Sequence, residues 1–300
     1  MEMVVGLIGC GRMGKAYGLN LLKAGYELLV YDVDPQALKD LTEQGAEAVA
    51  PKELAKKSQY VLIALPRSEI VEELLTGSNG IINDMQKGAT VIDMSTTSPE
   101  TTVKLAEAFS KIGVDFLDAP VSGHPEKAKE GTLTIIVGGE KSVFEAAREP
   151  IFQKLGKNIF HAGPSGTGQA LKLVNNLMYN INRLAMCEGF VMGVKAGIDP
   201  DVMLQVISLS SGASYAMNKN GPALLKHDFE SGESSLRLAC KTLKLIVDYG
   251  HELGSCLMLG NIAKQIYDSV RLKYGMELSP TAAVQFYEEA VQPVNQAKKS

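Results

Sequence analysis

The stretch GLIGCGRMGKAYG (residues 6–18) decides the fold of the first half of this chain. It carries the spacing GxGxxG at Gly9, Gly11 and Gly14, between a short apolar run and an amphipathic segment. In this context the first glycine permits a tight turn, the second lets a pyrophosphate approach the backbone, and the third allows close packing of helix on strand. The start of the following helix offers free N–H groups to phosphate. The stretch therefore predicts a dinucleotide-binding unit.

An acidic residue follows at the distance that such a unit requires. The run ELLVYD (27–32) is typical of a second buried strand and ends in Asp32. An acid here accepts hydrogen bonds from the adenosine ribose and repels a ribose phosphate, so we expect NAD rather than NADP. Without the glycine loop, the same aspartate would equally suit a turn. The cofactor contacts predicted from this unit are Gly9, Gly11, Arg12, Met13, Gly14 and Asp32.

Short apolar runs alternate with amphipathic segments through the first half of the chain. The expected strands cover residues 3–8, 27–32, 59–65, 89–94, 114–119, 132–139 and 157–163, and the clearest helices 15–25 and 99–112. Such alternation is typical of a parallel sheet covered on both faces. We therefore predict an α/β, doubly wound Rossmann domain that binds NAD over residues 1–164.

The pattern changes at Gly168, after which no convincing strand follows. Residues 168–197 are expected to form one long helix, ended by Gly197 ahead of a new helix start at Asp199-Pro200. Further helical patterns cover residues 199–210, 236–250, 254–273 and 279–291. We therefore predict an all-α carboxy-terminal domain over 165–300, whose first element (165–197) is an interdomain helix.

Three more loops follow expected strands. In a doubly wound sheet the carboxyl ends of the strands face the ligand crevice, so Leu65 and Pro66 of ALP and Thr96 of DMSTTSP are expected at the cofactor. Ser98 of the same heptapeptide instead suits a helix cap. In DAPVSG, Ser122 and the following N–H groups can bind an anion, although this sequence alone also suits a plain turn.

Composition excludes several classes of function. The 300 residues carry a net charge of -4 without a basic run, which disfavours nucleic acid and anionic membranes as partners. The most apolar segment, 170–198, is interrupted by charges, so no membrane span is expected. Four dispersed cysteines and four histidines show no disulfide or metal-ligand spacing. The first residues lack signal-peptide features, which favours the cytoplasm. Cys10, inside the glycine loop, suggests sensitivity to thiol reagents.

The stretch GQALKLVNN (168–176) places a lysine in the middle of the expected long helix. Helical spacing brings Gly168, Lys172 and Asn176 onto one face. Lys172 is either a surface lysine of an amphipathic helix or a catalytic lysine with an orienting amide one turn later. The nine residues alone leave both interpretations open.

Together these motifs resemble those of the β-hydroxyacid dehydrogenases, which include 3-hydroxyisobutyrate dehydrogenase and tartronate semialdehyde reductase. They appear in the family's order: GLIGCGRMG at 6–14, DMSTTSP at 93–99, DAPVSG with GTL at 118–133, and GQALKLVNN at 168–176. The resemblance covers nearly the whole chain. It implies a homodimer or homotetramer that interconverts a short β-hydroxyacid and its semialdehyde or keto form.

The resemblance also assigns catalytic roles. Lys172 would take the hydroxyl proton in oxidation and return it in reduction. Its ordinary pKa of about 10.4 is too high for this work, so desolvation or a nearby cation must lower it. Lys241 matches a family lysine on the nicotinamide side and is a candidate for that cation. Asn176 would keep substrate and Lys172 in register, and Gly168 would leave room for the ligand.

The substrate carboxylate would bind Ser122 and the N–H of Gly123, and here the chain departs from the family. His124 replaces a second family glycine, Lys127 replaces a later one, and Thr242 stands where the family has aspartate after its lysine. These changes bear on the substrate rather than on the reaction. His124 either meets a second anionic group or is, like Lys127, a solvated loop residue.

A finer resemblance concerns SSGASYAM (210–217). It is similar to a loop of 2-(hydroxymethyl)glutarate dehydrogenase, a family member that acts on a dicarboxylate, and it makes Ser214 and Asn218 candidate substrate contacts. The alternative is ordinary helix-start chemistry with Gly212 in a turn.

Two other functions remain on this scaffold: imine reduction, and NAD binding by a sensor without turnover. Imine-reducing relatives tend to carry aspartate or tyrosine at the position of Lys172, and a sensor has no need of the lysine. Lys172 therefore argues against both.

Overall fold

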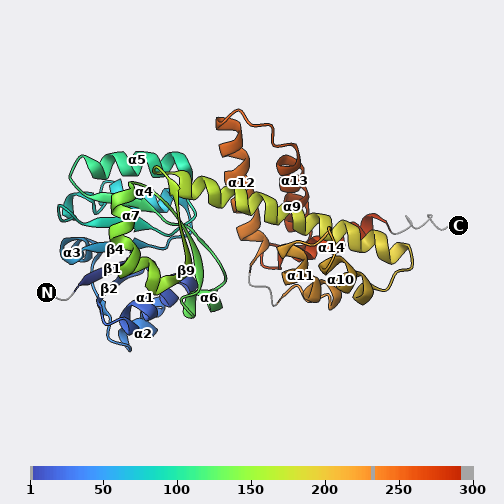
Figure 1. Ribbon diagram of the computed structural model, residues 1–300, viewed down its shortest axis with the longest axis horizontal. Coiled ribbons are helices and arrows are strands. Elements are labelled where there is room, and N and C mark those ends of the chain that lie inside the picture. Colours follow the sequence, from blue (N-terminus) through green and yellow to red (C-terminus); the bar gives the residue numbers. More distant parts are fainter. Residues whose placement is uncertain (1–2, 231–233, 292–300) are drawn as a thin grey trace, which may run out of the picture. The chain divides into compact units, whose positions relative to one another are not determined.

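The computed structural model describes residues 3–230 and 234–291, which form two compact units (Figure 1). The units divide between Lys172 and Leu173, inside the long helix α9 (Thr167–Lys195). The sequence placed the boundary between residues 164 and 165, before this helix. The difference arises because the first turns of α9 are bonded to the sheet of the first unit, as described below.

The first unit is built on a nine-stranded sheet in the order β3-β2-β1-β4-β5-β6-β8-β7, with β9 paired to β8. The strands are β1 (Val4–Ile8), β2 (Glu27–Tyr31), β3 (Glu47–Ala48), β4 (Tyr60–Ile63), β5 (Thr90–Asp93), β6 (Asp115–Asp118), β7 (Val121–Ser122), β8 (Leu133–Gly138) and β9 (Gly156–Gly163). β1 to β6 pair in parallel, which confirms the predicted doubly wound domain.

The sheet is mixed rather than wholly parallel at one end. β8 runs antiparallel to both β6 and β7. The connection from β6 to β8 contains only β7 and the short helix α6 (Pro125–Lys129), so no full crossover helix returns the chain in the parallel sense. The two-residue strands β3 and β7 were not predicted, because two residues are too few to show an apolar pattern.

Helices cover both faces of this sheet. The helices of the first unit are α1 (Arg12–Lys23), α2 (Pro35–Thr42), α3 (Pro51–Lys57), α4 (Ser68–Thr76), α5 (Pro99–Ser110), α7 (Lys141–Ala147), α8 (Gln153–Leu155) and the short turns η1 (Ile82–Asp84) and η2 (Arg148–Phe152). Along β4, Leu62 packs in the cluster that contains α1 and α7, whereas Val61 and Ile63 pack with α3, α4 and α5. Burial on both faces explains why the strands are continuously apolar.

The second unit is helical throughout the residues that the structure describes. After the first turns of α9 it contains α10 (Pro200–Ser208), α11 (Tyr215–Leu225), α12 (Leu236–Glu252), α13 (Met258–Tyr274), η3 (Pro280–Ala282) and α14 (Ala283–Ala290). Its core includes Phe190, Leu243 and Tyr267. The predicted all-α character is therefore confirmed for residues 173–230 and 234–291. No described helix has the length and apolar character needed to cross a membrane.

Capping residues set the helix boundaries of this unit. Asp199 accepts hydrogen bonds from the N–H groups of Asp201 and Val202 ahead of Pro200, as the sequence predicted. α11 was not expected, because Pro222 lies inside it and interrupts the helical pattern. Its cap is Ser214, whose Oγ accepts from the N–H of Met217 at 3.0 Å.

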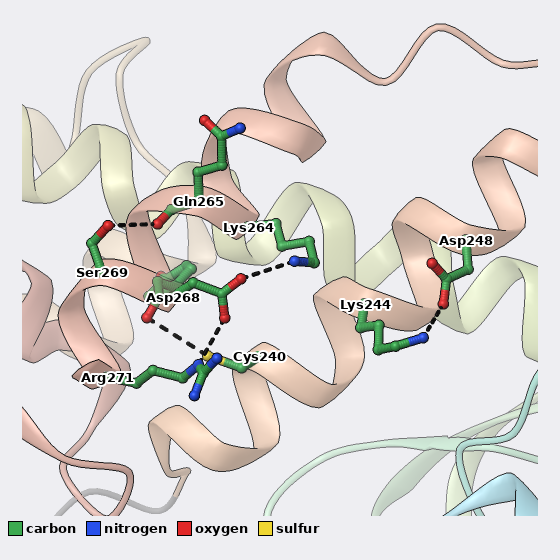
Figure 2. Close-up of polar contacts among 9 residues, drawn as sticks. Cys240, Lys244, Asp248, Lys264, Gln265, Asp268, Ser269 and Arg271 are labelled. Atoms are coloured by element: carbon green, nitrogen blue, oxygen red, sulfur yellow. Dashed lines mark hydrogen bonds and ion pairs between the residues drawn. The ribbon is translucent and has the colours of Figure 1, made fainter.

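Figure 2 shows polar contacts along α12 and α13, most of them within one helix. Asp268 accepts from Lys264 at 2.8 Å and from Arg271 at 2.7 Å, both on α13. The Cys240 thiol of α12 donates to the Tyr267 carbonyl of α13 at 3.7 Å. The Cys240 contact joins α13 to α12, the helix that carries Lys241.

Candidate active site

The glycine loop lies between β1 and α1 and has the geometry of a phosphate cradle. Gly9 has φ +94°, which favours glycine, and a Cβ on Gly14 would stand 1.8 Å from the Gly9 carbonyl oxygen. A Cβ on Gly11 would meet no atom within 4 Å, so the space beside this residue is open. α1 begins after Gly11 without a side-chain cap. Its first N–H groups and the open space fit the pyrophosphate of a dinucleotide.

Asp32 lies directly beside this loop. Its Oδ2 accepts from the N–H of Cys10 at 2.7 Å and its Oδ1 from the N–H of Asp34 at 2.9 Å. The two bonds fix the half-buried carboxylate at the end of β2. Each oxygen keeps a further lone pair, so ribose hydroxyls can still donate to it.

Cys10 itself is buried, which argues against the suggested sensitivity to thiol reagents. Burial, and then the charge of Asp32, raises the pKa of its thiol to about 12. The thiolate is the nucleophile that attacks thiol reagents, and it is scarce at such a pKa. Cys256 is the exposed cysteine of the chain.

The ALP loop and the segment after β5 lie next to the glycine loop. A Cβ on Gly9 would stand 2.3 Å from the Ala64 carbonyl oxygen and 3.1 Å from the Leu65 side chain. Leu65 in turn donates its N–H to Ser95 Oγ at 2.9 Å. Pro66 is exposed and Thr96 is half-buried. The predicted cofactor residues of the first unit thus gather at the carboxyl ends of β1, β2, β4 and β5.

The helix cap predicted from the same heptapeptide is confirmed. Ser98 Oγ accepts from the N–H of Thr101 at 3.0 Å, with Pro99 as the first residue of α5. Ser98 therefore has a structural role.

Two buried carboxylates at strand ends went unnoticed in the sequence. Asp93 accepts from the N–H of Ser95 and from Thr97 Oγ1, at 2.9 and 2.7 Å. Asp118 accepts from the N–H groups of Gly166 and Gln169, at 2.8 and 2.9 Å. Both aspartates are fully buried. The signal was present, because an aspartate at the end of a buried apolar strand needs polar partners.

Burial, with a smaller contribution from the charge of Asp93, raises the pKa of Asp118 to about 6 in spite of these two hydrogen bonds. Asp118 is far from α9 in sequence, and its two hydrogen bonds fasten the start of α9 to the end of β6. Gly168 makes this approach possible, because a Cβ there would stand 2.7 Å from both Asp118 Oδ2 and the Ile136 carbonyl oxygen. Within the first unit, then, Gly168 makes room for the sheet.

The anion loop after β6 also has a constrained backbone. Gly123 has φ +144°, and a Cβ there would stand 2.6 Å from the Leu133 side chain. Ser122 pairs with Thr134 in the sheet and is half-buried, as is His124. Lys127 is exposed to solvent, as the second alternative expected, but it lies in the short helix α6 and not in a loop.

Lys172 stands on the last turn of α9 that belongs to the first unit. The residue is half-buried. Burial of its ammonium group lowers the pKa to about 8. Desolvation, rather than a nearby cation, is therefore the cause of the lowered pKa of Lys172.

The remaining predicted residues belong to the second unit. The side-chain oxygen of Asn176 accepts a hydrogen bond from Asn175 Nδ2 at 3.4 Å. The main-chain carbonyl of Asn176 accepts one from Asn180 Nδ2 at 2.8 Å. Lys241 is half-buried on α12. Beside it Thr242 is buried and donates to the Leu238 carbonyl at 2.9 Å. At the position where the resemblance expects an aspartate, Thr242 has a hydroxyl that donates its hydrogen bond within its own helix.

The two residues of the finer resemblance also lie in the second unit. Ser214 is half-buried and caps α11, as the helix-start alternative describes, and Asn218 is exposed on the same helix. Ser214 Oγ accepts the capping bond, which leaves its own proton available to a ligand.

Comparison with known proteins assigns both halves of the chain. Residues 4–163 match the model of the NAD binding domain of 6-phosphogluconate dehydrogenase. Residues 166–287 match the model described as NAD-binding of NADP-dependent 3-hydroxyisobutyrate dehydrogenase. These matches confirm the class of cofactor predicted from the glycine loop.

Individual relatives agree with the models over most of their length. The chain is 37% identical to 2-(hydroxymethyl)glutarate dehydrogenase of Eubacterium barkeri over 89% of each protein. It is 36% identical to 3-hydroxyisobutyrate dehydrogenase of Pseudomonas aeruginosa over 88% of this chain and 90% of that protein.

A solved structure shows the same fold. The structure of 3-hydroxyisobutyrate dehydrogenase from Mycobacterium tuberculosis with L-serine superposes with a TM-score of 0.89 at 27% identity, over 96% of this chain and 99% of that one. Shared motifs, shared length and shared fold identify an oxidoreductase that acts on the CH–OH group of hydroxyacids. The chain belongs to the β-hydroxyacid dehydrogenase family.

Proposed function

We propose that this protein oxidises a short β-hydroxyacid to its semialdehyde or keto form with NAD, and catalyses the reverse reduction, with Lys172 as general acid–base. The observation that carries this proposal is the lysine itself. Its pKa of about 8 is suited to proton transfer near neutral pH, and its helix begins at the end of β6, among the cofactor loops.

The chain's residues divide the chemistry between them. NAD, when bound, accepts the hydride from the carbinol carbon. In oxidation the neutral Lys172 Nζ takes the hydroxyl proton, and in reduction the ammonium form returns it. Asn176, one helical turn later, holds the substrate hydroxyl in register with Lys172. Lys241 supplies a positive charge on the nicotinamide side.

Substrate recognition rests on the loop after β6. The Ser122 hydroxyl and the Gly123 N–H bind the carboxylate that lies β to the reacting hydroxyl. His124 and Ser214 are candidates to meet a second polar or anionic group of the substrate. The relatives' names support a short hydroxyacid, and one of them names a dicarboxylate.

Asp32 sets the preference for NAD over NADP. Its carboxylate is anchored to the glycine loop by the Cys10 N–H, so it cannot swing away from a ribose phosphate without breaking that bond. No arginine stands in the neighbouring VYDVD sequence to balance the phosphate charge.

Two further properties are proposed from the sequence. The protein is expected to act in the cytoplasm and to assemble as a homodimer or homotetramer. Imine reduction and NAD sensing without turnover remain the alternative functions, and the lysine at position 172 disfavours both.

The test is NADH formation from NAD at mildly alkaline pH across a panel of hydroxyacids. The panel contains 3-hydroxyisobutyrate, glycerate, serine, 4-hydroxybutyrate and 2-(hydroxymethyl)glutarate, each also assayed with NADP. Lys172→Ala should abolish turnover and leave the Kd for NAD unchanged. Lys195→Ala is the matched control, because Lys195 is exposed at the far end of the same helix.

Each result has a definite meaning. Lysine-dependent activity on one acid supports the reaction and names the substrate, and a high rank of the dicarboxylate supports the roles of His124 and Ser214. Full activity of Lys172→Ala removes the lysine from the mechanism. NAD binding without turnover on any acid supports a sensor.

A further inference from the structure

Gln169 is a fully buried amide in the first turn of α9 that the proposed reaction does not use. Its Nε2 donates to the Ser95 carbonyl at 2.9 Å, and its Oε1 accepts from the N–H of Thr97 at 3.2 Å. Both ends of the amide therefore bind the main chain, on either side of Thr96. A buried polar side chain that is satisfied in this way is held rigidly.

The segment that Gln169 holds is fixed from two other directions. Asp93 accepts hydrogen bonds from the Ser95 N–H and the Thr97 hydroxyl, at 2.9 and 2.7 Å. Ser95 Oγ accepts from the Leu65 N–H at 2.9 Å and thereby joins the segment to the ALP loop. The main chain around Thr96 is thus part of one network with the cofactor loops.

The main chain of Gln169 is fixed as well. Its N–H donates to the buried carboxylate of Asp118 at 2.9 Å. The close approach depends on two glycines, since a Cβ on Gly138 or on Gly168 would stand 2.5 or 2.7 Å from an Asp118 oxygen. Gln169 therefore joins the end of β5, through its side chain, to the end of β6, through its main chain.

We propose that Gln169 is a positioning residue for hydride and proton transfer. Its amide ties the Thr96 segment, on the cofactor side, to the helical turn that carries Lys172. Gln169 and Lys172 are three residues apart and therefore neighbours on the helix. The proposal rests on the proposed function, in which Thr96 faces the cofactor and Lys172 moves the proton.

The expected effect follows from the precision that such reactions need. A misplacement of about 1 Å between reacting groups can slow a reaction by about 100-fold. Gln169 touches neither substrate nor cofactor in this scheme, so its loss should act on the rate and not on binding. That separation distinguishes positioning from a general structural role.

The first variant is Gln169→Leu, which keeps the approximate volume and removes both hydrogen bonds. We expect kcat to fall by about 100-fold while the Kd for NAD changes by less than about threefold. The primary deuterium isotope effect on kcat should increase, because a slowed transfer step becomes rate-limiting. Gln59→Leu is the control: the exposed Gln59 amide also accepts a main-chain hydrogen bond, from the Val4 N–H, at the amino ends of the central strands β1 and β4.

The second variant, Gln169→Glu, gives a signature that a loss of stability does not produce. A neutral carboxyl group can donate to the Ser95 carbonyl and accept from the Thr97 N–H, whereas a carboxylate cannot donate. Burial and the neighbouring Asp93 and Asp118 raise the pKa of the new group. In the reduction direction, the activity of this variant relative to wild type should fall as pH rises through that pKa. This variant also serves if Gln169→Leu does not fold.

The outcomes separate the two proposals. An inactive wild type on every acid overturns the proposed function and the positioning role with it. Lysine-dependent wild-type activity, with unchanged kcat and isotope effect in Gln169→Leu, overturns the positioning role alone. So does a Gln169→Glu variant that follows the wild-type pH profile. A rate loss confined to the Gln169 variants and absent from Gln59→Leu supports it.

Discussion

If Lys172 moves the proton, as proposed, its pKa sets the pH range of the reaction. Burial lowers this pKa to about 8, so the neutral amine needed for oxidation accumulates as pH rises through 8. We expect kcat/KM for oxidation to rise about tenfold per pH unit below 8 and to level off above it. In the reduction direction the ammonium form is required, so kcat/KM should be level below 8 and fall above it. Rates measured from pH 6 to 10 in both directions test this, and a profile without a change of slope near 8 contradicts it.

We expect Asp32 to set the choice between NAD and NADP. Asp32→Asn removes the negative charge and keeps an oxygen that can accept the Cys10 N–H. We expect the ratio of kcat/KM for NAD to that for NADP to fall by about tenfold or more, which corresponds to about 1.4 kcal/mol. Asp34→Asn is the control, because Asp34 is also an aspartate close to Asp32 in sequence but serves as the cap of α2. An unchanged ratio in Asp32→Asn means that another group excludes the phosphate.

The helix α9 offers a matched pair of glycines for testing how it is seated. A Cβ on Gly168 would press on Asp118 and on the backbone of β8, whereas a Cβ on Gly189 would meet no atom within 4 Å. Gly168→Ala should therefore lower the free energy of unfolding of the first unit by about 1–3 kcal/mol. Gly189→Ala should raise stability by about 0.5–1 kcal/mol, because alanine favours the helix. Urea titration of both variants makes the measurement, and equal effects would show that Gly168 is not tightly seated.

The sequence predicted the elements whose own pattern is regular, and it missed those that are short, interrupted or set by the path of the chain. α1, α5, α9 and α10 were expected because each carries a regular apolar pattern between recognisable start or stop signals. α11 was hidden by Pro222, and β7 by its length. The antiparallel course of β8 depends on how the chain returns after β6, which local patterns do not encode.

We expect the whole molecule to assemble into an oligomer. Many apolar side chains of the second unit are exposed, among them Met258 at 72%, Leu259 at 63% and Ile262 at 52% in the first turns of α13. Contiguous exposed apolar surface often marks a site of association, and we propose that this surface is an interface between copies of the chain. We expect light scattering to give two or four times the monomer mass. The double change Leu259→Asp and Ile262→Asp should shift the protein toward monomer, and a wild type that is monomeric at micromolar concentration refutes the expectation.

For the molecule as a whole, the sequence by itself determined the class of fold, the glycine loop with Asp32, and the lysine at position 172. These features are local: a turn, a helix start and a periodic apolar face depend on neighbouring residues, and short motifs carry them in order. For the same reason the sequence sufficed for a resemblance to the family.

Only the tertiary structure decided what surrounds those motifs. The hydrogen bonds of Asp118 to the start of α9, and those of Gln169 on both sides of Thr96, join residues that are far apart in the chain. The burial of Cys10 and the pKa of Lys172 also depend on residues that are distant in sequence. Such contacts arise from how strands and helices pack, and desolvation depends on every atom that excludes water. The sequence names the groups proposed to react, and the packing sets their surroundings and their protonation.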